Sequence, residues 1–207
     1  MLSTGTWNIC FNPSNHEPLT QHELDHDCLC YMTFEGKPVK ASRIFLGHEH
    51  EVQQRKLAAY FEVASEEYKQ ITFNERLYHR LKSSPPSHFY PVEMEGSGPL
   101  PARPTQQTDY SNFDSFEQAQ HQLMIDLVAW QKLSIDLVDA DEKVKDVIIV
   151  GGFSKSPLFL AILKNEVPSR KFHLSDHPRA SALGAAWLVQ DDQLAFESGA
   201  LLNITRL

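Results

Sequence analysis

The sequence predicts one α/β domain over residues 1–207, built on a mixed five-stranded sheet with helices on both faces. Short strand-like runs separated by turn residues fill the first part of the chain, and helical and strand patterns alternate in the second part. Residues 147–150 (Val-Ile-Ile-Val) are too uniformly apolar for an edge strand, so they belong at the centre of the sheet. With 42% hydrophobic residues the chain can bury one sizeable core, and 207 residues are too few for two large domains.

The first part of the chain is expected to form a three-stranded meander followed by helices. Strand composition covers residues 4–11, 29–34 and 39–45, with turns between them. Residues 49–61 then carry apolar side chains at helical spacing, and residues 65–80 continue as one or two helices.

A stretch rich in proline and glycine, residues 83–112, follows these helices. Its repeated prolines, together with Gly96 and Gly98, leave no room for a regular element. Such a loop is either a flexible insertion or an ordered lid over a site, and the sequence is compatible with both.

The second part of the chain is expected to alternate helix and strand. Asp114 and Glu117 form a capping box for a long amphipathic helix that faces the sheet. After the central strand, a helix that begins near Ser156 leads to a short strand at 171–174 and a last helix at 178–189.

Charge and cysteine content exclude several classes of protein. A formal net charge of −8 and a pI near 5.6 argue against a nucleic-acid surface, which needs clustered Lys and Arg. The three cysteines are odd in number and follow no secretory leader, so we expect a reducing, cytoplasmic setting without a disulfide framework. No apolar run approaches the roughly 20 residues of a membrane helix, and the chain is expected to be soluble.

The most informative motif joins the central strand to the next helix. Gly151 and Gly152 follow the strand, and Ser156 with Pro157 opens the helix. Glycines let backbone approach a bulky ligand without a Cβ in the way, and unpaired N–H groups at a helix start attract anionic oxygens. This junction fits a nucleotide, although such corners also occur as plain packing turns.

A second candidate phosphate loop lies near the N-terminus. Residues 3–11 predict a hairpin strand whose Thr4-Gly5-Thr6 turn lets hydroxyl and backbone N–H groups converge on a phosphate. Residues 182–188 (Ala-Leu-Gly-Ala-Ala-Trp-Leu) add a helix of small residues after the diglycine motif. Two such loops at opposite ends of one domain are more specific than either loop alone.

Together these segments resemble the C-terminal domain of the FGGY carbohydrate kinases, members of the actin-like ATPase superfamily. That domain carries a Ser/Thr-Gly-Thr phosphate loop, a Gly-Gly adenosine loop and a Leu-Gly-Ala-Ala helix in the same order. The resemblance covers nearly the whole chain, is strongest over residues 146–189, and implies a ribonuclease-H-like fold. Trp7 after the first loop is more similar to the rhamnulokinase and fuculokinase branches.

The resemblance implies a nucleotide-binding site formed by Thr4, Gly5, Thr6, Gly151, Gly152, Phe153 and Ser156. The threonine-glycine turn would contact the outer phosphates through N–H and hydroxyl groups, and the two glycines would line the nucleotide. Phe153 would border the adenine or ribose through its backbone, and Ser156 would hydrogen-bond near the adenine. Phe153 replaces the small residue usual in the family, so its ring could stack on the base or narrow the pocket.

The resemblance also implies a second domain that we expect to be absent from this chain. In the family, an N-terminal domain supplies an Asp-x-Gly-Thr loop for phosphate and magnesium, most sugar contacts and an Asp general base. We therefore expect ATP and ADP as ligands, with magnesium held mainly by the other domain. A ketose of the rhamnulose, fuculose or xylulose type would bind only with that domain, so the isolated chain should be inactive as a kinase.

Two further possibilities concern the biological role of the chain. A truncated or split gene could instead encode a non-catalytic nucleotide-binding or interaction module. The face that normally meets the first domain should expose apolar surface, which makes a homo-oligomer possible.

Zinc binding is the main rival chemistry, with candidate ligands His16, His22, Asp25, His26, Asp27, Cys28, Cys30, His48 and His50. A Cys-x-Cys pair with scattered histidines is not one of the strong zinc spacings, and on a strand both cysteines would share one face as small core residues.

Lys155 lacks the flanking pattern of a phosphate-binding lysine and is expected to be exposed. Gly184, Ala185 and Ala186 suit helix packing better than ligand contact, and no Ser-His-Asp arrangement supports a hydrolase.

Overall fold

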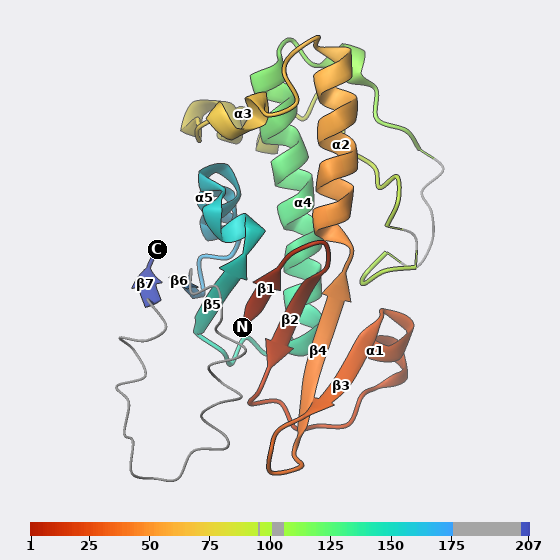
Figure 1. Ribbon diagram of the computed structural model, residues 1–207, viewed down its shortest axis with the longest axis vertical. Coiled ribbons are helices and arrows are strands. Elements are labelled where there is room, and N and C mark those ends of the chain that lie inside the picture. Colours follow the sequence, from red (N-terminus) through yellow and green to blue (C-terminus); the bar gives the residue numbers. More distant parts are fainter. Residues whose placement is uncertain (95, 101–105, 176–203) are drawn as a thin grey trace.

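A seven-stranded mixed sheet forms the centre of the molecule in the computed structural model, which describes residues 1–94, 96–100, 106–175 and 204–207 (Figure 1). The strand order is β3-β4-β2-β1-β5-β6-β7. The strands are β1 (Leu2–Thr4), β2 (Asn8–Asn12), β3 (Cys28–Met32), β4 (Pro38–Ile44), β5 (Asp146–Gly151), β6 (Lys171–Ser175) and β7 (Ile204–Arg206). β1 pairs with β5 and β5 with β6 in parallel, whereas the other neighbours are antiparallel.

The α/β class with a mixed sheet is confirmed, but the expected number of five strands is wrong. The predicted turn at Thr4-Gly5-Thr6 separates two strands, β1 and β2, where one strand over residues 4–11 was counted. The chain reverses there, and Gly5 N–H donates to Trp7 O at 3.2 Å. β7 adds an antiparallel strand beside β6. The predicted helix at 178–189 lies outside the described residues.

Eight helical segments are present in the described part of the chain. They are α1 (Gln21–Asp25), α2 (Leu46–Tyr60), η1 (Glu67–Gln70), α3 (Glu75–Ser83), η2 (Tyr110–Asn112), α4 (Phe116–Val138), η3 (Gly152–Lys155) and α5 (Pro157–Glu166). Figure 1 shows α2 and α4 side by side, with α4 behind β1, β2 and β4. None of these helices is long and apolar enough to cross a membrane.

The long helix α4 is registered on the sheet by buried polar contacts. Asn8 Nδ2 donates to Gln131 Oε1 at 2.8 Å, and Asn12 Nδ2 donates to the carbonyl of Val138 at 2.9 Å. A buried donor or acceptor without a partner costs about 1–3 kcal/mol, so these bonds favour one placement of the helix.

The helix start predicted from a capping box at Asp114 and Glu117 is wrong by one residue. Ser115 is the N-cap, and its hydroxyl accepts from Gln118 N at 3.2 Å. The Gln118 side chain returns to accept from Asp114 N–H at 2.5 Å. A serine hydroxyl therefore takes the cap position, and Gln118 binds the N–H of the residue before the cap.

The predicted loop over 83–112 begins at the last residue of α3, contains the short helix η2, and is anchored on α2 and α4 at residues 89–93. Glu49 on α2 is fully buried, and its carboxylate accepts from the N–H groups of Val92 and Glu93 at 2.9–3.1 Å. Asp126 on α4 accepts from Phe89 N–H at 2.8 Å, and burial raises the pKa of this carboxyl group. The described part of this loop is thus an ordered packing segment.

Replacing Glu49 should loosen this loop. In Glu49→Gln, one carboxylate oxygen becomes an amide that cannot accept from backbone N–H groups, so we expect a loss of about 1–3 kcal/mol in urea unfolding and faster proteolysis within residues 84–94. Glu51→Gln on the exposed face of the same helix is the control and should change stability by less than about 0.5 kcal/mol. Equal stability of the two variants would contradict the anchoring role.

Candidate functional site

The two predicted phosphate loops lie against each other at one end of the sheet. β1 and β5 are parallel neighbours with Thr4 opposite Gly151. Thr4 Oγ1 donates to Val150 O at 2.6 Å and accepts from Phe153 N at 3.0 Å. One hydroxyl therefore connects the turn after β1 to the diglycine turn after β5.

Gly151 permits this contact because no larger residue fits beside Thr4. Its φ of 94° lies in the left-handed region, and a Cβ built on it would be 1.7 Å from Thr4 O. Gly152 is different, since the nearest heavy atom to its added Cβ is 4.0 Å away. The first glycine is required for backbone contact, whereas the second leaves open space in front of the turn.

The N-terminal end of α2 closes the other side of the first turn. A Cβ on Gly47 would be 1.8 Å from Gly5 O, and His48 N–H donates to Thr6 O at 3.2 Å. Gly47 was not singled out by the sequence analysis, which began this helix at residue 49. A glycine two residues after the end of a predicted strand was the available signal.

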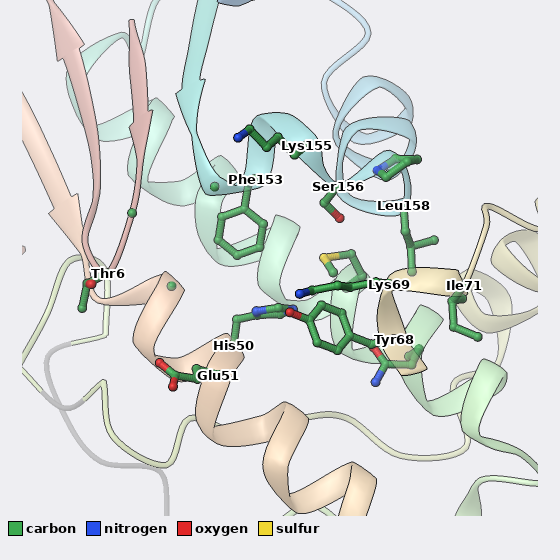
Figure 2. A pocket seen from close by; sticks show the side chains of 16 residues that line it. Thr6, His50, Glu51, Tyr68, Lys69, Ile71, Phe153, Lys155, Ser156 and Leu158 are labelled. Atoms are coloured by element: carbon green, nitrogen blue, oxygen red, sulfur yellow. The ribbon is translucent and has the colours of Figure 1, made fainter. Parts of the chain in front are cut away.

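A cavity of about 570 Å³ lies between the two turns, α2 and the start of α5 (Figure 2). Among the described residues it is lined by Gly5, Thr6, Gly47, His50, Glu51, Tyr68, Lys69, Ile71, Gln120, Met124, Gly152, Phe153, Lys155, Ser156, Pro157 and Leu158. This volume is within the usual range of small-ligand pockets. No described residue of the 83–112 loop lines it, so that part of the loop is not a lid over this cavity.

Five of the seven predicted site residues line this cavity, namely Gly5, Thr6, Gly152, Phe153 and Ser156. Thr4 and Gly151 lie behind the lining and hold the two turns together. The ring of Phe153 is buried and packs on Phe159, with centroids 4.5 Å apart. Ser156 caps α5 by accepting from Phe159 N at 3.3 Å.

The middle of the cavity is formed by residues that the sequence analysis did not assign to it. His50 projects from α2 toward Tyr68 and Phe153, with ring centroids 5.3 and 5.2 Å away (Figure 2). Burial lowers the pKa of His50 to about 4, so its imidazole is neutral at pH 7. Gln54 Nε2 lies 3.1 Å from His50 Nε2 and also donates to Gln120 Oε1 at 2.8 Å. No local pattern marked these residues, because the fold brings them together from separate segments.

Two lysines stand at the edge of the cavity. Lys155 is exposed, as expected, and forms no ion pair within the described part of the chain. Lys69 is paired with Glu66, and this hydrogen bond raises the pKa of Lys69. The lining of the cavity thus combines glycine backbone, aromatic rings and the ammonium groups of two lysines.

The candidate zinc ligands do not converge among the described residues. No group of three or more His, Cys, Asp or Glu side chains there could hold a metal ion. Cys28 is buried but Cys30 is exposed, so the expectation that both are core residues is wrong for Cys30. Burial decreases along β3 from Cys28, which follows α1, to the exposed residues Cys30–Met32.

This geometry defines an α/β domain with a glycine-lined cavity between two adjacent turns. Residues 1–197 match the model of the family described as carbohydrate kinase FGGY, C-terminal domain, and the chain belongs to this family. Kinases of this family use ATP. No curated protein matches the sequence.

Solved structures show the same fold at low sequence identity. A carbohydrate kinase from Novosphingobium aromaticivorans is similar with a TM-score of 0.67 and 20% identity, over 99% of this chain and 40% of that one. Xylulose kinase from Rhodospirillum rubrum is similar with a TM-score of 0.62 and 15% identity, over 100% of this chain and 41% of that one. Ligand-bound xylulose kinase from Lactobacillus acidophilus is similar with a TM-score of 0.63 and 12% identity, over 100% of this chain and 41% of that one. The chain spans about 40% of the length of these structures.

Substitution of the two adjacent glycines should have different effects. Gly151→Ala forces a Cβ into Thr4 O at a left-handed φ, so we expect a loss of more than about 2 kcal/mol or failure to fold. The Cβ added in Gly152→Ala has no heavy atom closer than 4.0 Å, so the free energy of unfolding of this variant should lie within about 1 kcal/mol of the wild-type value. Urea denaturation followed by circular dichroism measures the stability of both variants. Similar losses of stability in the two would contradict the close contact between Gly151 and Thr4 O.

His50 should make the protein less stable in acid. The pKa of His50 is about 4 in the folded state and near 6.5 in the unfolded state. As the pH falls from 6.5 to 4, the unfolded state therefore binds more protons, and the free energy of unfolding decreases. Between pH 7.5 and pH 5 this difference costs about 2 kcal/mol. In His50→Phe, which keeps a ring, that part of the pH dependence should disappear from urea unfolding. An unchanged dependence would contradict burial of a neutral imidazole.

Proposed function

We propose that this chain is the nucleotide-binding half of an ATP-dependent sugar kinase that phosphorylates a ketose. The supporting observation is the convergence of the turn after β1 and the turn after β5 on one cavity. Family membership supports ATP as the nucleotide. The xylulose kinases among the similar structures favour xylulose as the ketose, whereas rhamnulose and fuculose rest on Trp7 alone.

The phosphate groups would bind at the glycine turns. Backbone N–H groups at Thr6 and Gly152, with the hydroxyl of Thr6, can donate to anionic oxygens, and Gly5 and Gly152 present no Cβ that would block their approach. Thr4 and Gly151 would act by holding these turns in register. Lys155 adds positive charge at the edge of the cavity.

The base and ribose would occupy the aromatic part of the cavity. Phe153, whose ring is already packed on Phe159, would present its backbone, and Ser156 would offer its hydroxyl proton while its oxygen caps α5. Tyr68 and Leu158 supply apolar surface opposite these groups. Large rings and aliphatic side chains suit a planar base, which needs little charge for its recognition.

Phosphoryl transfer requires more than this half. A transferred phosphoryl group needs an in-line hydroxyl and cations that neutralise its charge. Glu51 is the sole carboxylate among the described lining residues, so this part of the chain offers too few oxygen ligands to hold magnesium alone. We propose that magnesium, when bound, is held mainly by residues of the N-terminal domain, which also supplies the sugar site.

Binding and catalysis can be separated experimentally. Calorimetry should show ATP and ADP binding to the isolated chain, and Gly152→Val, whose side chain enters the cavity, should weaken it at least about 10-fold. Lys143→Ala, an exposed site far from the cavity, is the control and should bind as the wild type does. A coupled ADP-release assay with xylulose, rhamnulose and fuculose should show no turnover by the chain alone.

Adding the N-terminal domain of a related kinase should restore sugar-dependent ADP release. Sugar-dependent turnover without that domain would contradict the division into two halves. Nucleotide binding that never leads to turnover with any such domain would favour a non-catalytic binding module. Absence of nucleotide binding would refute the proposed function.

A further inference from the structure

Strand β3 ends the sheet on one side and has an exposed outer edge. No strand in the described part of the chain pairs with this edge (Figure 1). The side chains at and after its end are unusually exposed for apolar residues, with Tyr31 at 42%, Met32 at 73% and Phe34 at 78%. Exposed apolar edge strands readily pair with another strand, and proteins usually protect them with charge or proline.

The hydrogen bonds between β3 and β4 show which backbone groups point outward. Thr33 N–H donates to Lys37 O at 2.8 Å, so these opposed residues form a hydrogen-bonded pair. Because such pairs alternate along an antiparallel ladder, Leu29 and Tyr31 also bond to β4. The N–H and C=O groups of Cys28, Cys30 and Met32 therefore face outward at even spacing.

The charge around this edge favours a second copy of the same chain. Residues 28–34 carry no charged side chain, although the chain as a whole has a net charge of −8. The carboxylates that flank this segment are all paired: Asp27 with Arg43, Glu23 with Lys40, and Glu35 with Lys37. Two copies would repel each other over most of their surface but meet no like charges along this strand.

We propose that two copies of this chain pair antiparallel through β3, across a two-fold axis at Cys30. Cys30 then lies opposite Cys30 of the other copy, and Cys28 lies opposite Met32, so every outward N–H meets an outward C=O. Tyr31 of each copy then pairs with Leu29 of the other copy, on the face of the sheet away from the Cys30 side chains. The result is one continuous sheet through both copies, with the cavity of each far from the contact.

Charge at the axis tests this interface directly. Light scattering after size exclusion should give a dimer for the wild-type 207-residue chain at about 50 μM. Cys30→Lys places two ammonium groups opposite each other, so the dissociation constant of its dimer should be at least about 10-fold higher. Cys30→Thr keeps a strand-forming side chain and should remain dimeric, and Leu133→Lys, exposed on α4, is the control for an added charge elsewhere.

Oxidative cross-linking gives an independent readout. Opposed residues in a hydrogen-bonded pair have Cα atoms about 5.5 Å apart, within the range of a disulfide. Mild oxidation, with a copper catalyst and oxygen removing two electrons and two protons, should link the copies through Cys30, because Cys10 and Cys28 are buried. The link should be absent in Cys30→Thr. A wild-type monomer, or a dimer that survives Cys30→Lys, would overturn the proposal.

Discussion

The contact between Thr4 and Gly151 is the constraint on which the site depends. Two parallel strands place these residues side by side, and the Thr4 hydroxyl bonds to Val150 O and Phe153 N on the partner turn. The backbone at Gly151 is so close that a methyl group would overlap Thr4 O. α2 adds a second close contact, because Gly47 lies directly against Gly5 O. Three segments distant in sequence are thereby fixed around one cavity, and none of them could form it alone.

The chemistry of the cavity follows from this arrangement. Glycine turns expose backbone N–H groups where an anionic ligand would lie, and the rings of His50, Tyr68 and Phe153 occupy its centre. A neutral His50 adds no charge to this centre, so the positive charge comes from lysines at the edge. Such a site is suited to holding a nucleotide. The proposed division of labour, with the nucleotide bound here and the sugar bound by another domain, rests on this combination of groups.

Much of the fold could be predicted from local sequence patterns. The strand at 147–150, the helix after Ser156 and the long helix to Val138 all follow from periodicity and cap residues, which are local properties. The turn at Thr4-Gly5-Thr6 was predicted, but β1 was not counted as a separate strand, because only Leu2–Thr4 form it. Glu49 and Asp126 were not recognised as loop anchors, since a buried carboxylate has no sequence signature apart from its distant partners. The same reason hid His50, Tyr68 and Gln120 from the predicted site.

The central claim is that the two turns hold one nucleotide together. Hydrogen–deuterium exchange of the isolated chain, with and without a non-hydrolysable ATP analogue, tests it most directly. The account predicts that residues 5–7 and 151–155 become protected at the same analogue concentration, while β3 does not change. Protection of a single turn, or of neither at saturating analogue, would contradict it.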